Sequence, residues 1–106
     1  MIALTNDAAT VIVDPAAGGR IASITIAGRE VLVTGSASDG PMMWGSFPMV
    51  PWAGRVRRGR FSFEDRDYEL EVNLAPHAIH GTGFTRPWHV EPGGSLRLDL
   101  LDGWPF

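Results

Sequence analysis

The chain has 106 residues, a formal net charge of −3 and no cysteine. A chain of this length fits one small domain, and its mild negative charge lacks the basic surface that nucleic-acid binding requires, so we expect no nucleic-acid partner. The missing cysteines exclude disulfide bonds and thiolate chemistry, and no apolar run reaches the length of a membrane span, so we expect no membrane partner.

The first third of the chain predicts short strands. Residues 1–15 lack the basic region and the long apolar core of a signal peptide, and we expect a cytoplasmic protein. Residues 9–15 are a β-branched run that stops at Asp-Pro, which predicts a strand. Residues 20–34 carry apolar runs on both sides of a tight turn at residues 27–29, which predicts two more strands.

The rest of the chain also predicts strands and turns. Residues 35–41 form a polar loop, and residues 42–56 are apolar but interrupted by prolines and glycines, which predicts an irregular or edge segment. Residues 61–72 alternate apolar and polar side chains around a charged turn, the clearest hairpin pattern. Residues 86–91 and 95–101 repeat the strand signal. No eleven-residue window has helical periodicity, so we expect an all-β antiparallel fold, a β-sandwich.

The end of the chain is unusually apolar. Residues 99–106 follow a predicted strand directly and finish on Trp-Pro-Phe, whereas chain termini are more often polar and frayed. A sandwich that stopped here would leave open strand edges and an exposed apolar face. We therefore expect these residues to be the first part of a longer, truncated fold.

Two of the three histidines lie in the stretch "PHAIHG". We expect no metal at His77 and His80, because positions i and i+3 of a strand face opposite sides and no cysteine can complete a zinc site. The simplest role for either histidine is a hydrogen bond to loop backbone. His80 differs because it precedes Gly81, whose missing side chain would let a ligand approach the backbone. An imidazole in that position can donate or accept a proton near neutral pH.

Arg55 is the second residue of interest, because it follows Trp52 and Gly54 in a proline-rich segment. A guanidinium offers a rigid fork of donors and an indole offers a flat apolar face. Both suit a sugar, which presents hydroxyl groups and apolar C–H faces. The arginines at positions 57, 58 and 60 agree equally well with a solvated hairpin edge, so composition alone leaves both interpretations open.

The ordered set of motifs resembles a known family. The chain contains, in this order, "GSFPMVPWAGRVRRGRFSFEDRDYEL", "HAIHG" and "RPWHV", and this set resembles the N-terminal part of the aldose 1-epimerase (galactose mutarotase-like) family. The opening "VIVDPAAGGRIASITIAGREVLV" resembles the family's first strands. The resemblance covers nearly the whole chain. It implies a large antiparallel β-sandwich, the galactose mutarotase-like supersandwich, with residues 1–106 as the N-terminal part of a single domain.

The resemblance also implies an activity and a site. Family members are isomerases that interconvert the α and β anomers of free hexoses by acid–base ring opening, without a metal or an organic cofactor. Arg55 matches the sugar-binding arginine, and His80 matches the His-Gly histidine, which contacts the sugar and supports proton transfer. Trp52 belongs to the same substrate site. His77 has a supporting place, since many relatives have asparagine there, and Gly54 also replaces an asparagine.

The family's principal acid and base, a histidine and a glutamate, belong to later motifs that these 106 residues do not contain. We therefore expect the chain alone to lack mutarotase activity. Three alternatives remain open: a hexose-6-phosphate 1-epimerase, a non-catalytic carbohydrate-binding domain, and a β-rich structural fragment without a ligand. The first is suggested by "HGTGFTRPW" and by four arginines that could hold a phosphate, namely Arg57, Arg58, Arg60 and Arg86.

Overall fold

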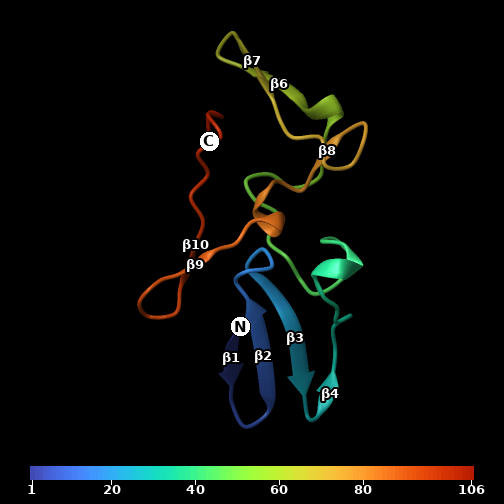
Figure 1. The fold of residues 1–106 in the computed structure, drawn as a ribbon, viewed down its shortest axis with the longest axis vertical. Helices are drawn as coiled ribbons and strands as arrows, with labels where there is room; N and C mark the ends of the chain where they lie inside the picture. Colours follow the sequence, from blue (N-terminus) through green and yellow to red (C-terminus); the bar gives the residue numbers. More distant parts are fainter. The chain divides into compact units, whose positions relative to one another are not determined.

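The computed structural model describes residues 1–106 and contains ten short strands and three 3-10 turns. The chain divides into two compact units (Figure 1). The first comprises Met1–Pro48 and Gly83–Leu98, and the second comprises Met49–Thr82 and Asp99–Phe106. All named strands pair in antiparallel fashion, which confirms the predicted all-β antiparallel fold class. None of the helical turns is long and apolar enough to cross a membrane.

The first unit is built on a four-stranded meander. Its strands follow one another in chain order, as β1 (Ile2–Thr5), β2 (Ala9–Asp14), β3 (Arg20–Ile26) and β4 (Arg29–Glu30). Ala27 and Gly28 both have positive φ values, 48° and 78°, which is the geometry of a two-residue hairpin turn. The predictions for β2 and β3 are confirmed. The strand predicted from the apolar run at residues 31–33 is wrong in position, because β4 covers only Arg29–Glu30 and residues 31–33 lie outside any strand.

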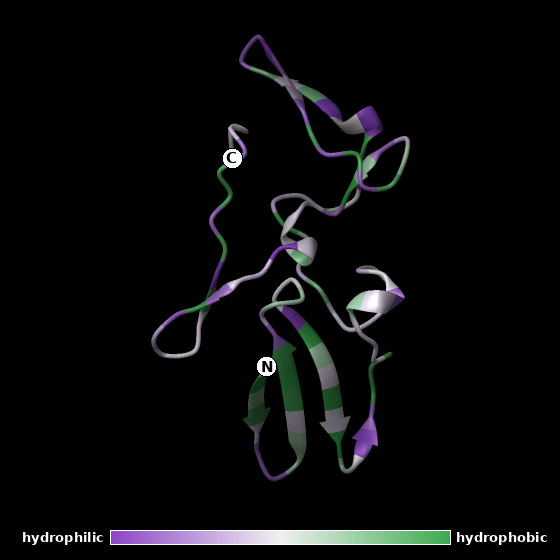
Figure 2. Ribbon diagram, in the orientation of Figure 1, coloured by the Kyte–Doolittle hydropathy of each residue, from purple (hydrophilic) through white to green (hydrophobic).

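One face of this sheet gathers apolar side chains. The register places Ile2 opposite Val13 and Leu4 opposite Val11. Figure 2 shows that β1 and β2 are largely hydrophobic. Leu4 is 58% exposed and Ile26 is 48% exposed, so much of this face remains open to solvent.

The turn after β4 is organised by the Glu30 carboxylate. It accepts hydrogen bonds from the Ser23 hydroxyl and from the backbone N–H groups of Ile24, Val31 and Leu32. These bonds, the Ser23 bond foremost, lower the pKa of Glu30 below its ordinary value. One exposed side chain thus ties the end of β4 to β3.

We expect Glu30→Gln to make the stability of this sheet less dependent on pH in the acid range. A lowered carboxylate pKa stabilises the folded state above the unfolded pKa, about 4.3, and this contribution disappears as the pH falls through the lower folded value. The variant should have a lower urea midpoint at neutral pH and should approach the wild type in acid. The amide NMR signals of β3 report the midpoint, and Glu64→Gln, in an exposed turn, is the control. Equal wild-type and Glu30→Gln midpoints at every pH would contradict this role.

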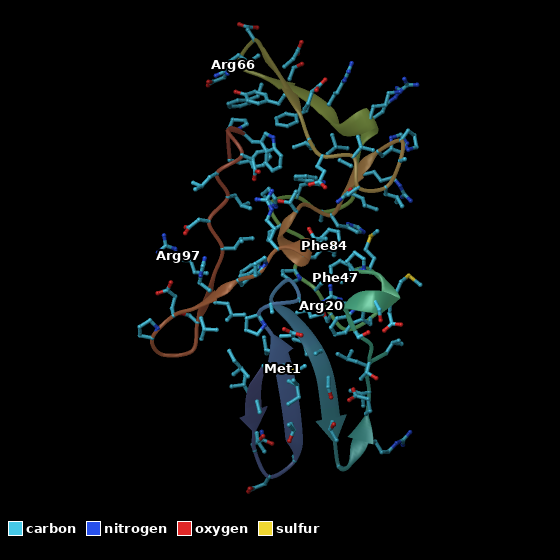
Figure 3. All side chains as sticks on the ribbon, viewed as in Figure 1. Met1, Arg20, Phe47, Arg66, Phe84 and Arg97 are labelled. Carbon is cyan, nitrogen blue, oxygen red and sulfur yellow. The ribbon has the colours of Figure 1, made fainter.

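A buried arginine lies at the centre of the first unit. Arg20 is 2% exposed, and its guanidinium lies 4.1 Å from the centre of the Trp44 ring. Phe47 and Phe84 pack against each other at 5.1 Å and lie beside it (Figure 3). Burial lowers the pKa of Arg20, and the Asp14 carboxylate acts in the opposite direction. The guanidinium donates to four backbone carbonyls, which belong to Ala17, Trp44, Pro41 and Phe84.

The remainder of the first unit is made of short elements, namely the 3-10 turns η1 (Ala37–Asp39) and η3 (Gly83–Thr85) and the paired strands β9 (His89–Val90) and β10 (Leu96–Arg97). The strand signals near the end of the sequence are confirmed, but each strand has only two residues. The Trp88 indole N–H donates to the Gly83 carbonyl at 2.9 Å, which joins this segment to η3.

The second unit contains the elements β5 (Arg55–Val56), η2 (Arg57–Gly59), β6 (Arg60–Phe63), β7 (Arg66–Glu69) and β8 (Ala78–Ile79). The predicted hairpin is confirmed as β6 and β7, which join through Glu64 and Asp65, both at positive φ. The predicted irregular segment before β5 is also confirmed. β8 was not predicted, because its two residues pair only with the distant β5.

Aromatic side chains gather on one face of the hairpin. Phe61 stacks on Tyr68 with ring centres 5.1 Å apart and on Phe106 at 5.8 Å. The Trp104 indole N–H donates to the Glu69 carbonyl at 3.0 Å. The apolar end of the chain, which the sequence marks as unusual, therefore packs on the β6–β7 hairpin.

Candidate functional site

The two principal candidates, Arg55 and His80, lie at one end of the ladder between β5 and β8. Arg55 pairs with Ile79 in this ladder. The next pair along is Gly54 and His80, where the His80 N–H donates to the Gly54 carbonyl at 3.0 Å. Gly54 and His80, which are 26 positions apart in the sequence, thus occupy neighbouring backbone positions.

A second hydrogen bond between these strands fixes the His80 imidazole. The Gly54 N–H donates to His80 Nδ1 at 3.0 Å. A backbone amide can only donate, so Nδ1 must be the acceptor nitrogen and the neutral ring carries its proton on Nε2. His80 therefore presents an N–H donor at Nε2, and it cannot act there as a base without losing the Gly54 bond.

Gly81 has a different role from the one that the sequence suggested. A Cβ at this position would lie 1.8 Å from the Val50 carbonyl oxygen, and φ is +73°. Val50 and Gly81 form a β-bridge, and the Thr82 N–H donates to the Val50 carbonyl at 2.9 Å. The space that the missing side chain leaves is filled by backbone, so the prediction that a ligand approaches there is wrong.

Arg55 offers an available cation. Its side chain is exposed and takes part in no ion pair, whereas Arg60 is paired with Glu69 at 3.1 Å. A guanidinium that is not already bonded to a carboxylate retains its donors for a polar ligand. Arg55 therefore has donors available for a ligand next to the Gly54–His80 pair, and Arg57 and Arg58 are likewise exposed and outside any ion pair.

His77 lies on a neighbouring loop rather than in the Gly54–His80 pair. Its Nδ1 accepts the Arg58 N–H at 3.0 Å, and its backbone exchanges two hydrogen bonds with Leu74. Arg58 has a left-handed backbone, with φ of 53°. The structure thus gives His77 a backbone partner in η2, and its supporting role at the sugar site stays a prediction.

Trp52 packs in an aromatic cluster. Its ring meets Trp104 edge-on at 5.9 Å and Phe106 at 6.4 Å, and its indole nitrogen is buried without a hydrogen-bond partner. The Trp52 ring therefore has aromatic neighbours from the end of the chain. Its place in a substrate site stays a prediction.

Two further features bear on other ligands. Arg86, one of the four arginines considered for a phosphate, belongs to the first unit, whereas the other three belong to the second. The structure contains no group of three or more histidine and carboxylate side chains that could hold a metal ion. Asn73, which the sequence motifs did not indicate, bonds to the backbone on both sides of His80. Its one sequence signal is an asparagine that interrupts a strand-like run.

Comparison with known proteins agrees with the fold and the motifs. The family model described as aldose 1-epimerase matches residues 1–106. The Escherichia coli K12 protein YphB is 41% identical over 44 residues, which are 40% of this chain and 15% of YphB. Among solved structures, a candidate aldose 1-epimerase from E. coli K12 is 30% identical, with a TM-score of 0.69, over 81% of this chain and 30% of that one.

A galactose mutarotase-like protein from Clostridium acetobutylicum has the same TM-score, 0.69, at 20% identity, and the match covers 92% of this chain and 31% of that one. The chain therefore has the galactose mutarotase-like fold and spans about a third or less of the length of these relatives. On the strength of the family match over residues 1–106, the chain belongs to the aldose 1-epimerase family.

Proposed function

We propose that this chain contributes part of the sugar site of an aldose 1-epimerase that acts on free hexoses, as the N-terminal part of a single β-sandwich domain. The observation that carries the proposal is the β5–β8 ladder, which holds Arg55 beside the Gly54–His80 pair and fixes a proton on His80 Nε2. Family membership supports a sugar substrate. An exposed guanidinium and an imidazole N–H are donors suited to sugar oxygens.

The reaction requires two proton transfers. A base removes the proton from the anomeric hydroxyl, the bond between the anomeric carbon and the ring oxygen breaks, and an acid protonates that oxygen. The open aldehyde rotates and closes from its other face, which gives the other anomer. In this scheme the His80 Nε2–H donates a hydrogen bond to a sugar oxygen at the reacting end and supports proton transfer to it. Arg55 holds the sugar in place.

Because His80 Nδ1 accepts the Gly54 N–H, the imidazole is suited to donate a hydrogen bond through Nε2. It leaves the base to another group, in line with our expectation that the principal acid and base belong to motifs outside these 106 residues. The free-hexose proposal is preferred to the phosphorylated one because Arg60 is already paired with Glu69.

We expect galactose or glucose to shift the amide NMR signals of Gly54 and His80 saturably. Arg55→Met should weaken binding by about tenfold to a hundredfold, because hydrogen bonds to charged groups contribute roughly 1.5–3 kcal/mol. Arg57→Met removes another exposed arginine two residues away and serves as the matched control. Polarimetry with fresh α-glucose should show no acceleration by the chain alone.

Three outcomes separate the alternatives. Unshifted Gly54 and His80 signals at high sugar concentration, in a folded chain, would refute the site. Tighter binding of glucose 6-phosphate than of glucose would favour the phosphorylated substrate. Acceleration of mutarotation well above buffer would contradict the expectation that the principal acid and base belong elsewhere.

A further inference from the structure

We propose that Asn73 is a positioning residue for His80, an inference that rests on the proposed function of the same site. The Asn73 amide makes three hydrogen bonds to the two residues that flank His80. Its Oδ1 accepts the Ile79 N–H at 2.7 Å, and its Nδ2 donates to the Ile79 carbonyl at 2.9 Å and to the Gly81 carbonyl at 3.2 Å. One half-buried side chain therefore holds the backbone on both sides of the imidazole.

His80 needs this support because its backbone is in an unfavourable conformation. Its φ is +59°, in the left-handed region that residues with a Cβ seldom adopt, and Gly81 follows at +73°. Such conformations persist only where the surroundings determine them strongly. Three bonds from Asn73 and two from Gly54 converge on residues 79–81.

The position of this loop also determines which imidazole nitrogen of His80 carries the proton. His80 Nδ1 accepts the Gly54 N–H at 3.0 Å only while the loop keeps the ring in place. If the loop shifts by an ångström, this bond weakens and both ring tautomers become accessible, because hydrogen-bond strength falls steeply with distance and angle. Asn73 thus acts through the loop to keep the proton on Nε2.

The imidazole ¹⁵N signals of the intact chain, recorded without sugar, test this proposal. In the wild type, Nδ1 should resonate as an unprotonated acceptor and Nε2 as a protonated nitrogen. In Asn73→Ala the two His80 signals should move toward each other, whereas those of His77 should stay unchanged. Asn6→Ala is the matched control, because Asn6 also bridges loop backbone, through the N–H groups of Ala8 and Ala9 in the first unit.

A second variant guards against a folding defect. Asn73→Asp keeps an acceptor for the Ile79 N–H but turns an oxygen toward the two carbonyls, so it should also mix the His80 tautomers. Unchanged His80 signals in either folded variant would overturn the proposal. So would unfolding of the second unit in both variants, because Asn73 would then act on folding rather than on His80.

Sugar binding provides a separate measurement. By analogy with the partners of metal-binding histidines, Asn73→Ala should weaken it about tenfold. If the wild type binds no sugar but its His80 tautomer still depends on Asn73, the proposed function fails and the positioning role stands.

Discussion

Replacing Gly81 by alanine is expected to unfold the second unit. The new Cβ would lie 1.8 Å from the Val50 carbonyl oxygen and 2.2 Å from its carbon, distances that real Cβ atoms do not show. Neither group is the end of a flexible side chain, so the β-bridge between Val50 and Gly81 must separate. We expect a loss of more than about 4 kcal/mol, a large part of the stability of a small domain.

The Gly54→Ala variant distinguishes the stability lost to this steric overlap from the stability lost to backbone strain. Gly54 has φ of +79°, close to the +73° of Gly81, but a Cβ there would meet nothing within 4 Å. It should therefore lose only the roughly 1–2 kcal/mol of a left-handed alanine. Urea unfolding followed by the amide signals of residues 49–82 measures both variants. Equal losses for the two alanines would show that the close approach to Val50 is not what requires glycine at position 81.

Local patterns predicted most of the sheet structure. β2 is a β-branched run, and the β6–β7 hairpin alternates apolar and polar side chains around a charged turn, while β3 carries spaced apolar residues before a tight turn. These signals lie within a few positions of each other. β1 was missed because Ile2–Thr5 is short and opens the chain. β8 was missed for a different reason: its two residues become a strand only through β5, more than twenty residues away.

The sequence selected residues for the candidate site but gave no arrangement for them. The motif order selected Arg55 and His80, and both do lie at the β5–β8 ladder. The Gly54 N–H that bonds to His80 Nδ1 is a backbone group, so no pattern of side chains in the sequence predicts this contact. Gly81 illustrates the same limit, since a required glycine marks a close approach without saying whether a ligand or the chain itself makes it.

Replacing Arg20 by methionine is expected to destabilise the first unit by about 3 kcal/mol. Methionine matches the length of the arginine stem but leaves the carbonyls of four residues without their donor: Ala17, Pro41, Trp44 and Phe84. Each unsatisfied buried polar group costs roughly 1–3 kcal/mol. Removing the charge also relieves the desolvation that lowers the pKa of Arg20, which offsets part of this loss.

Whether Arg20→Met destabilises or stabilises the first unit depends on how many backbone carbonyls lose their donor. A buried ion pair can often be replaced by apolar side chains without loss, because both partners leave together. Arg20 has carbonyl partners that remain after the substitution, so the loss should exceed the relief. The stability of Arg20→Lys should lie between those of the wild type and Arg20→Met, since an ammonium has three donors in place of five. Urea unfolding followed by the amide signals of β2 and β3 measures each variant, with the exposed Arg29→Met as a control expected within about 0.5 kcal/mol of the wild type. An Arg20→Met protein as stable as Arg29→Met would show that the four carbonyls find other partners and that the guanidinium does not hold the loops of the first unit together.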